Sequence, residues 1–320
     1  MLGYIATTKK RTHKKRGVFM QFKNLDQNKA FIKSEAKRLG ISVGAAYSTY
    51  YSRILLERLS NINYGHLVVK GSFSQYIHLN ELSRPVLDID LSSEQDHHLP
   101  LSLLFKAIYE SEDEIVSFDL TTLPRQTKNG VYKIPVVAKI EYPNDDRKIL
   151  IPIPIDYKEN NNVIFETQFK GVEPLFQGER KFFVNVPSFE EHIAEKLYII
   201  AHCRRDDIPN TRVKDFYDIY KLHGKEYDSD KFSLYFQMML LMYGEDLNNI
   251  STNFLNKTYI QNHEELWKKM KKKYEFADQD LELAEALYYA KAVLNEQIQK
   301  ISSRQFTDQA MKLVREKKRR

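Results

Sequence analysis

The chain has 320 residues, of which 42% are hydrophobic and 12% aromatic, so it can bury a large core and is not a disordered protein as a whole. The net charge of +6 lies at the two ends, since residues 21–310 hold 37 basic against 42 acidic residues, and this excludes a nucleic-acid surface covering the whole body. The single cysteine, Cys203, excludes an internal disulfide and favours a cytoplasmic location, and no apolar run approaches the roughly 20 residues of a membrane-spanning helix.

Residues 1–23 read as a basic tail. Residues 1–20 contain six basic residues and no acidic one, and no apolar core follows them, so we do not expect a secretory signal. The stretch KKRGVFM can be encoded by the A- and G-rich codons of a translated ribosome-binding region, which would make Met20 the natural start. A solvated tail explains the sequence equally well, and both interpretations stay open.

The first half of the chain alternates helices and strands. Asn24 or Asp26 can cap the first helix, and Gly40 can end it. Apolar periodicity and turn residues give the elements that follow. Their expected order is helix 24–40, helix 42–62, strand 66–71, helix 72–82, strand 86–92 and helix 99–111.

Two longer stretches, VYKIPVVAKIEY and KILIPIPIDYK, alternate as strands around the turn YPNDD. In the second stretch the isoleucines share one face, whereas Pro152, Pro154 and Asp156 share the other. The prolines indicate an edge strand or a strand end. From residue 186 onward the pattern is nearly all helical. The sequence therefore predicts an α+β fold, with an α/β domain over residues 24–185, built on a small mixed sheet with flanking helices, and a helical C-terminal domain over residues 186–320.

Asp88 and Asp90 lie two residues apart on a predicted strand, so both carboxylates leave the same face. Adjacent carboxylates stay ionised only when a cation lies between them, and hard oxygen ligands suit Mg²⁺ or Mn²⁺. Asp156 can supply a third carboxylate from a neighbouring strand, although Glu141 competes for that place. A solvated pair of acids at a strand end explains the residues equally well.

Gly71 and Ser72 add a possible phosphate site. Glycine lets the backbone approach a phosphate closely, and Ser72 offers an N–H group at a helix N-terminus together with a hydroxyl. Residues 73–87 then allow about three helical turns and a return to the sheet. The combination predicts a metal–phosphate site with moderate specificity.

These residues resemble the DNA polymerase β-like nucleotidyltransferase superfamily, which reads hydrophobic strand, Gly-Ser, spacer and Asp-hydrophobic-Asp. More narrowly, the chain is similar to the AbiEii/AbiGii family of nucleotidyltransferase toxins from abortive-infection and toxin–antitoxin systems. One family motif matches Lys70, Gly71 and Ser72, with Arg84 ahead of the acids. A second matches VPSFEEHIAEKLYIIAHCRRDDIPNTRVKDFYDIYKL, and the resemblance covers residues 24–222.

The chain departs from the family pattern at several positions. Ser72 replaces a glycine, which the wider superfamily accepts, and Val86 replaces a frequent hydroxyl residue, which puts any role of that hydroxyl in doubt. Lys214 and Asp215 stand where Arg-Asp is usual, and DDIPNT lengthens the loop before them. AYSTYYSR replaces an acidic stretch in an early helix.

The resemblance implies roles for the matched residues. Lys196 would reach the triphosphate, and Asp215 and Asp218, three apart on a helix, would orient it or touch the nucleotide. Arg84 would pair with Asp88 or contact a phosphate. The implied catalytic residues are Asp88, Asp90, Asp156 (third metal ligand or base), Lys196 and Asp215; the metal ligands are Asp88, Asp90 and Asp156; the nucleotide-binding residues are Lys70, Gly71, Ser72, Arg84, Lys196, Lys214 and Asp218.

Simpler interpretations compete with some of these. Lys196 can be a solvated lysine, Asp215 can cap its helix, and Tyr217 and Tyr220 fit packing better than base stacking. Another pair, His97 and His98, fits a loop better than a zinc site, because no cysteine partner is near. The run KKMKKKYEF fits a solvated helix face better than an RNA groove.

The resemblance implies a metal-dependent nucleotidyltransferase that consumes an NTP and acts as a toxin. It also implies an RNA acceptor, with the 3′ end of tRNA as one option, and a cognate antitoxin encoded nearby; we expect no membrane contact. The alternatives are nucleotidylation of a protein, phosphotransfer by the same site, and a non-catalytic module that binds a nucleotide or a partner.

Overall fold

The computed structural model describes residues 22–63, 65–93, 98–110, 115–159, 165–202, 212–245, 250–274, 278–301 and 304–319. The expectations for residues 1–21 and for Cys203 lie outside these ranges. The helices are α1 (Leu25–Leu39), α2 (Val43–Ser60), α3 (Gly71–Leu79), α4 (His98–Tyr109), α5 (Phe189–His202), α6 (Lys214–Tyr220), α7 (Ser229–Met242), α8 (Lys257–Tyr274), α9 (Leu283–Ile301) and α10 (Arg304–Arg319). The strands are β1 (Val68–Val69), β2 (Ile89–Ser92), β3 (Val116–Leu120), β4 (Arg125–Gln126), β5 (Val131–Glu141), β6 (Lys148–Lys158), β7 (Thr167–Val172) and β8 (Phe182–Pro187).

The first helices begin and end where the sequence indicates. Asn24 caps α1 by accepting the Gln27 N–H at 2.9 Å, and Gly40 ends the helix at φ +70°, a conformation that favours glycine. Ser42 caps α2 in the same way. Helix α3 begins one residue earlier than predicted, at Gly71.

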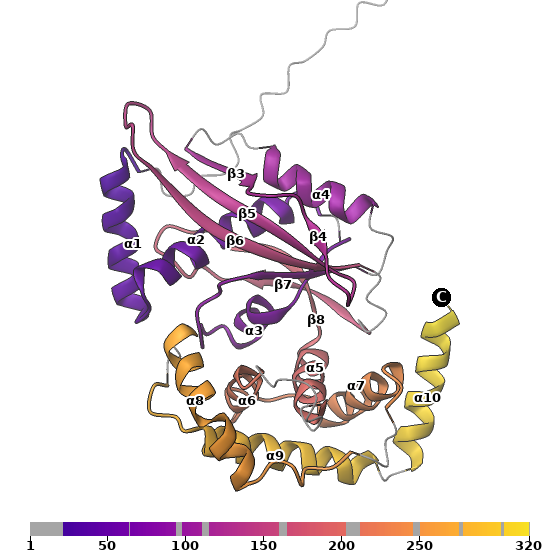
Figure 1. Cartoon of the computed structure of the whole chain (residues 1–320). Helices are drawn as coiled ribbons and strands as arrows, with labels where there is room; N and C mark the ends of the chain where they lie inside the picture. The colour runs from indigo at the N-terminus through magenta and orange to yellow at the C-terminus, as the bar shows by residue number, and fades with distance from the viewer. Residues whose placement is uncertain are drawn as a thin grey trace, which may run out of the picture.

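The strands form one mixed sheet in the order β3-β5-β6-β2-β1-β8-β7, with β4 paired to β5. Strand β1 is parallel to β8 and β2 is parallel to β6, whereas the other pairs are antiparallel. Figure 1 shows α1–α4 with the sheet in the upper part of the molecule and α5–α10 gathered below it. The predicted α+β class, a mixed sheet with flanking helices followed by a helical segment, is confirmed.

Strand β6 is interior to the sheet and its two prolines lie in its middle, so the prediction of an edge strand or a strand end is wrong. It pairs with β5 along its whole length but with β2 only from Ile155 onward. Pro152 and Pro154 lie in the half that has a neighbour on one side alone. Because proline lacks an N–H group, it is tolerated where no second strand needs that donor.

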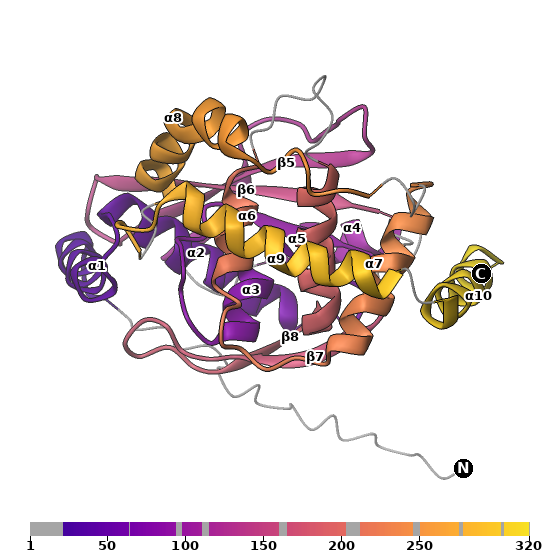
Figure 2. The same ribbon diagram turned by 90° about the horizontal axis from the view of Figure 1, so that it is seen from below.

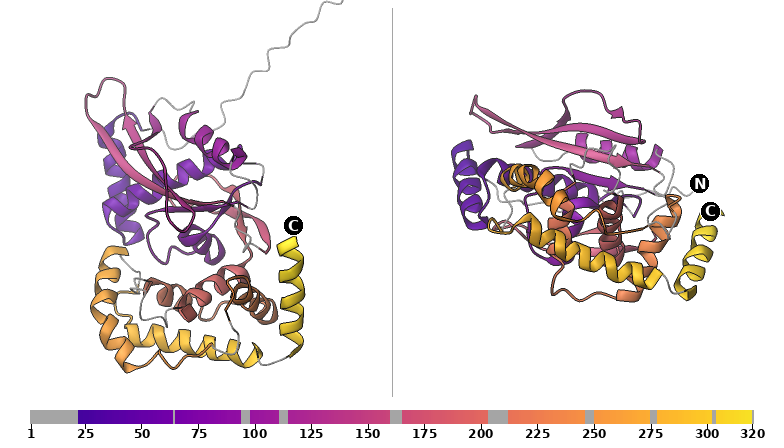
Figure 3. Two further views of the ribbon diagram at one scale, coloured as in Figure 1. Left: turned by 45° about the vertical axis from the view of Figure 1, so that its right-hand side comes forward. Right: turned by 60° about the horizontal axis from the view of Figure 1, so that its bottom comes forward.

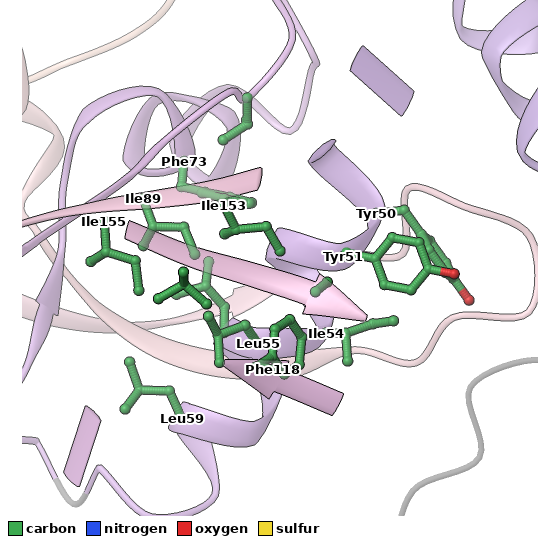
Figure 4. Packing of buried hydrophobic residues seen from close by; sticks show 14 of the residues in the cluster. Tyr50, Tyr51, Ile54, Leu55, Leu59, Phe73, Ile89, Phe118, Ile153 and Ile155 are labelled. Carbon is green, nitrogen blue, oxygen red and sulfur yellow. The ribbon is translucent and has the colours of Figure 1, made fainter. Parts of the chain in front are cut away.

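The sheet packs its apolar face on α2. Ile89 of β2 and Ile153 and Ile155 of β6 lie close to Ile54 and Leu55 of α2, and each is at most 2% exposed (Figure 4). Because side chains alternate along a strand, the residues between these isoleucines project from the opposite face of the sheet. The core therefore decides which face carries the acids of β2 and β6.

A second cluster of buried apolar side chains fills the helical half, from Ile193 to Val314, and Leu79 of α3 joins it. Seen from below, α9 crosses α5 and α6 (Figure 2), and α10 stands beside α7 (Figure 3). The break between the clusters falls between β8 and α5, close to the domain boundary at residue 185 that remains a prediction. In the described part of the chain, every helix is too short or too polar to cross a membrane.

Candidate active site

Two acids meet on the face of the sheet opposite the isoleucine core. Asp90 of β2 and Asp156 of β6 are direct register partners on parallel strands, and Asp88 lies just ahead of β2. On β5, Lys133 is the residue opposite Asp156. Glu141 lies eight residues farther along the same strand, opposite Lys148. Eight residues of strand span about 26 Å, so Glu141 is too remote to be the third carboxylate.

Gly71 is required by a close approach to Asp90. The residue has φ +60°, and a Cβ placed on it would lie 1.8 Å from Asp90 Oδ2 and 2.7 Å from Cγ. The N–H of Lys70 donates to the carbonyl of Asp90 at 2.8 Å, which fixes the end of β1 beside β2. The first turn of α3 is therefore held directly against an acid of the site.

The start of α3 offers donors to an anion. No side chain caps the helix at Lys70, and the first N–H groups of a helix have no partner within it. The Oγ atom of Ser72 is buried and has no hydrogen-bond partner among the described residues. A buried hydroxyl without a partner costs about 1–3 kcal/mol, so a phosphate oxygen at this place would relieve an existing cost.

Replacing Gly71 with alanine should displace the Asp90 carboxylate and reduce nucleotide-dependent activity at least about tenfold, since small misplacements of reacting groups cost that much or more. Activity is measured as the initial rate, and folding by urea unfolding. Gly130→Ala is the matched control: Gly130 also has positive φ (+77°), but an added Cβ meets no atom within 4 Å. Equal activity loss in both variants would show that backbone strain, and not the contact with Asp90, explains the effect.

The acids form a crowded negative cluster. Burial and then the Asp88 carboxylate raise the pKa of Asp90 to about 6, with Asp156 adding to the repulsion and Lys214 opposing it. The Asp156 carboxylate pairs with Lys133 on β5. Within the described ranges, no three His, Cys, Asp or Glu side chains converge closely enough to hold a metal ion. The crowding is nonetheless the charge pattern that a divalent cation relieves, so the donor set fits Mg²⁺ or Mn²⁺ chemically.

Two residues that the sequence did not single out join the site. Glu195 of α5 accepts Lys70 Nζ at 2.7 Å and, although burial opposes the charge, raises the pKa of Lys70. Lys158 lies two residues after Asp156 on the same face of β6, and burial followed by the Lys70 charge lowers its pKa. It pairs with no carboxylate among the described residues. Two features of the sequence could have pointed to these residues: Lys158 lies two residues after Asp156, and Glu195 is next to Lys196.

A buried ion network lies behind the acids. Lys196 Nζ contacts Asp215 Oδ1 at 2.9 Å and Asp218 Oδ2 at 3.0 Å. Arg84 donates from Nε and Nη2 to the two oxygens of Asp218 at 2.9 and 3.1 Å, and Arg212 contacts Asp215 at 3.0 Å. Although burial disfavours each charge, the two aspartates raise the pKa of Lys196, and Arg84 and Lys196 lower that of Asp218.

This network decides between the interpretations that the sequence left open for Lys196, Arg84 and Asp215. Asp215 and Asp218 orient Lys196, whose side chain is only 9% exposed, so a solvated lysine is the wrong interpretation. Arg84 pairs with Asp218 and not with Asp88. Val213, and not Asp215, occupies the cap position of α6.

The cation of Lys214, the first residue of α6, lies 5.4 Å from the centre of the Tyr274 ring, and Arg84 lies 5.3 Å from the same centre. The tyrosines of α6 pack, as expected: Tyr217 is fully buried and donates to the Ser83 carbonyl at 2.8 Å, and Tyr220 donates to Glu285.

The segment that precedes the acids has no helix or strand but is buried. Arg84 is held by Asp218, and Val86 exchanges hydrogen bonds with the Thr49 hydroxyl at 3.3 Å. Ser83 accepts from Tyr217 through its carbonyl and from Gln75 through its hydroxyl. Contacts from α2, α3 and α6 therefore fix residues 83–86.

The remaining candidates do not join the site. His97 lies outside the described residues, and His98 is the first residue of α4, so its placement in a loop is wrong. The lysine-rich run lies on α8, where Lys268 pairs with Glu265 at 3.1 Å and Lys271 donates to the Leu281 carbonyl at 3.0 Å. The other lysines of this run are exposed, as expected for a helix face in contact with solvent.

Two histidines lie side by side behind the site, with the ring centres of His78 and His192 5.8 Å apart. His78 Nε2 contacts the Pro187 carbonyl at 2.9 Å, which makes this nitrogen the donor, and Nδ1 accepts from Lys170 at 3.2 Å. Burial and then the Lys170 charge lower the pKa of His78 to about 4. His192 is buried, and burial lowers its pKa as well.

Acid should therefore destabilise the fold through the protonation of His78. His78 takes up its proton near pH 6.5 when unfolded but near pH 4 when folded, so stability falls as pH drops through this window, by about 2 kcal/mol between pH 7 and pH 5 for this residue. Urea unfolding at the two pH values measures the loss. His78→Gln, which keeps a donor for Pro187, should remove most of this contribution, whereas His223→Gln, at an exposed histidine, should not. An unchanged loss in His78→Gln would contradict the assignment.

The comparisons with known proteins come from a family model and from solved structures. The family model described as "Nucleotidyl transferase AbiEii toxin, Type IV TA system" matches residues 53–300, which include all the candidate catalytic, metal-binding and nucleotide-binding residues. No curated protein gives a significant match. A candidate nucleotidyltransferase from H. pylori is similar over 80% of this chain and 96% of its own, with a TM-score of 0.48 and 13% identity. JHP933 from Helicobacter pylori is similar over 85% and 99%, with a TM-score of 0.46 and 14% identity.

Proposed function

The chain belongs to the AbiEii family of nucleotidyltransferase toxins, and we propose that it transfers a nucleoside monophosphate from an NTP to a hydroxyl group of an RNA. Nucleotidyl transfer is the activity of the family, and the RNA acceptor is our proposal. The observation that carries it is the contact between Gly71 and Asp90, which holds the donor-rich start of α3 against the acids.

In the proposed reaction, the acceptor oxygen attacks the α-phosphorus of the NTP. A new oxygen–phosphorus bond forms, the bond from the α-phosphorus to the oxygen bridging to the β-phosphate breaks, and pyrophosphate leaves with the bonding electrons. The proton of the attacking hydroxyl passes to Asp156, the acid opposite Asp90 in the sheet. Catalysis of this kind rests on positioning and charge neutralisation.

The chain's own residues supply most of that positioning. Ser72 and the first N–H groups of α3 bind phosphate oxygens, and Lys158 neutralises part of their charge. Lys196, held by two aspartates, acts as a fixed positive charge behind the phosphates. A divalent metal, Mg²⁺ or Mn²⁺, would be held by Asp88 and Asp90, whose carboxylates repel each other without it, and would neutralise the triphosphate and lower the pKa of the attacking hydroxyl.

RNA is favoured over protein as the acceptor by charge. The 3′ terminus of an RNA offers a hydroxyl next to phosphates that basic residues can hold, and α10 presents Lys312, Arg315 and Lys318 to solvent. We further propose the 3′ end of tRNA as the acceptor and an antitoxin encoded nearby as the partner, because the family is described as a toxin of a toxin–antitoxin system.

The position of the label tests the reaction. The purified chain is incubated with Mg²⁺, total RNA and each NTP labelled at the α- or the γ-phosphate, and the products are separated on denaturing gels. The expected result is α-label in an RNA band of defined size, absent in an Asp90→Asn variant. Transfer of γ-label would indicate phosphotransfer, and α-label in protein would indicate protein nucleotidylation. Either result, or no transfer to RNA from any NTP, would overturn the proposal.

A further inference from the structure

Two stacked tyrosines, one half-buried and one exposed, lie near the Lys70–Glu195 ion pair at the start of α3. The rings of Tyr198 on α5 and Tyr243 at the end of α7 have centres 4.6 Å apart and planes inclined by 17°. Tyr243 is 46% exposed although it stacks on its neighbour. His202, one helical turn after Tyr198, adds a third ring 5.3 Å from it.

The position of Tyr198 along α5 connects the pair to the site. Glu195, which holds Lys70 at the start of α3, lies three residues before Tyr198, so the two side chains lie on the same face of the helix, roughly 5–6 Å apart at Cβ. Tyr243 is close enough to sense both members of that ion pair: burial and then Glu195 raise the pKa of its hydroxyl, while Lys70 opposes the shift. The stacked rings therefore lie beside the proposed triphosphate site.

We propose that Tyr198 and Tyr243 form a stacking platform for a nucleobase, either that of the NTP or the terminal base of the acceptor. The proposal rests on the proposed function and deepens it, because it assigns a binding site for the base, whereas the proposed function assigns residues only to the phosphates. An aromatic pair stacked in parallel extends a base stack by one further ring, and the exposed part of Tyr243 leaves room for it. Stacking of a base on an aromatic side chain contributes about 1–3 kcal/mol and accepts every base.

The surrounding charges favour a nucleotide over a peptide or a lipid. Lys70 and Lys158 influence each other electrostatically at the end of the sheet next to Glu195, so cations for phosphates and aromatic rings for a base lie in one region. A flat, polarisable base stacks on parallel aromatic rings more favourably than a flexible apolar chain packs on them. The platform should consequently affect affinity more than the choice among the four bases.

Binding without turnover tests the platform. The affinities of the α,β-methylene analogues of ATP and CTP and of ribose 5′-triphosphate, which lacks a base, are measured by calorimetry in Mg²⁺. The wild-type chain should bind the nucleotide analogues about tenfold to a hundredfold more tightly than ribose triphosphate if the platform holds the NTP base. Tyr243→Ala should abolish that difference, and Tyr243→Phe should preserve it because stacking needs the ring and not the hydroxyl. Tyr288→Ala, at a tyrosine of α9 that is 50% exposed, is the matched control.

A second measurement separates the two sources of the base. If the platform holds the terminal base of the RNA, Tyr243→Ala leaves the analogue affinities unchanged and raises KM for RNA by a similar factor. Unchanged analogue affinities together with an unchanged KM would overturn the proposal, as would an equal loss in Tyr243→Phe. The analogues bind without reacting, so the two proposals can fail separately. If the wild-type chain transfers nothing to RNA, the proposed function is wrong. The difference in affinity between the nucleotide analogues and ribose triphosphate still tests the platform.

Discussion

Replacing Asp90 with asparagine should lower the rate of nucleotidyl transfer at least about a hundredfold while the protein stays folded. Stabilisation of transition-state charge by a bound metal is worth several kcal/mol, and 2.7 kcal/mol is a factor of about 100 in rate. The fold should not suffer, because the Asp90 charge is repelled by Asp88 and Asp156 and the amide removes that repulsion. Release of pyrophosphate from labelled NTP measures the rate, and urea unfolding measures stability.

Asp146→Asn is the control for this substitution. Asp146 is an exposed acid in the turn between β5 and β6, at the end of these strands remote from Asp156, so its loss should change the rate less than twofold. A rate in Asp90→Asn within a few-fold of the wild type would show that the acid pair is not part of the catalytic apparatus, whatever the family assignment.

Replacing Asp218 with alanine should lower the free energy of unfolding by about 3–5 kcal/mol, the usual effect of removing one partner from a buried ion pair. Asp218 is buried and receives both Arg84 and Lys196, so the alanine variant leaves two buried cations without this partner. Urea unfolding monitored by circular dichroism gives the magnitude. The double variant Arg84→Met with Asp218→Leu should recover part of the loss, because it removes the charges together.

An exposed ion pair provides the comparison. Asp119 pairs with Lys139 at 2.7 Å on the surface of the sheet, and both side chains are more than a third exposed, at 43% and 35%. Asp119→Ala should therefore cost less than about 1 kcal/mol. Similar losses in Asp119→Ala and Asp218→Ala would mean that burial of the network contributes nothing.

Much of the fold could be predicted because its signals are local. Asn24 and Gly40 mark the ends of α1, and the alternating isoleucines of β6 mark its buried face. The sequence pattern does not predict strands β3, β4, β7 and β8. In β7 and β8 the alternation is misleading, since Phe169 and Phe183 lie on the outer face, 70% and 45% exposed, and stack on each other there. An apolar residue that faces solvent cannot be told from a core residue by pattern alone.

The acids and the glycine of the site could be predicted for the same reason. A two-residue spacing on a strand fixes the shared face of Asp88 and Asp90, and a glycine before a helix indicates a close approach. The ion pairs could not be predicted. Arg84 and Asp218 are 134 residues apart in the chain, and Lys70 and Glu195 are 125 apart, so only the packing of the helical half against the sheet decides which charges meet.

The buried segment ahead of β2 has a consequence for how the enzyme meets its substrate. Residues 83–86 have no regular structure, yet Thr49, Gln75, Tyr217 and Asp218 restrain them from three helices. A loop restrained in this way has already given up its conformational entropy during folding. The acids that it leads into should thus require little reorganisation when an NTP arrives, so more of the binding energy remains for the phosphates and the base.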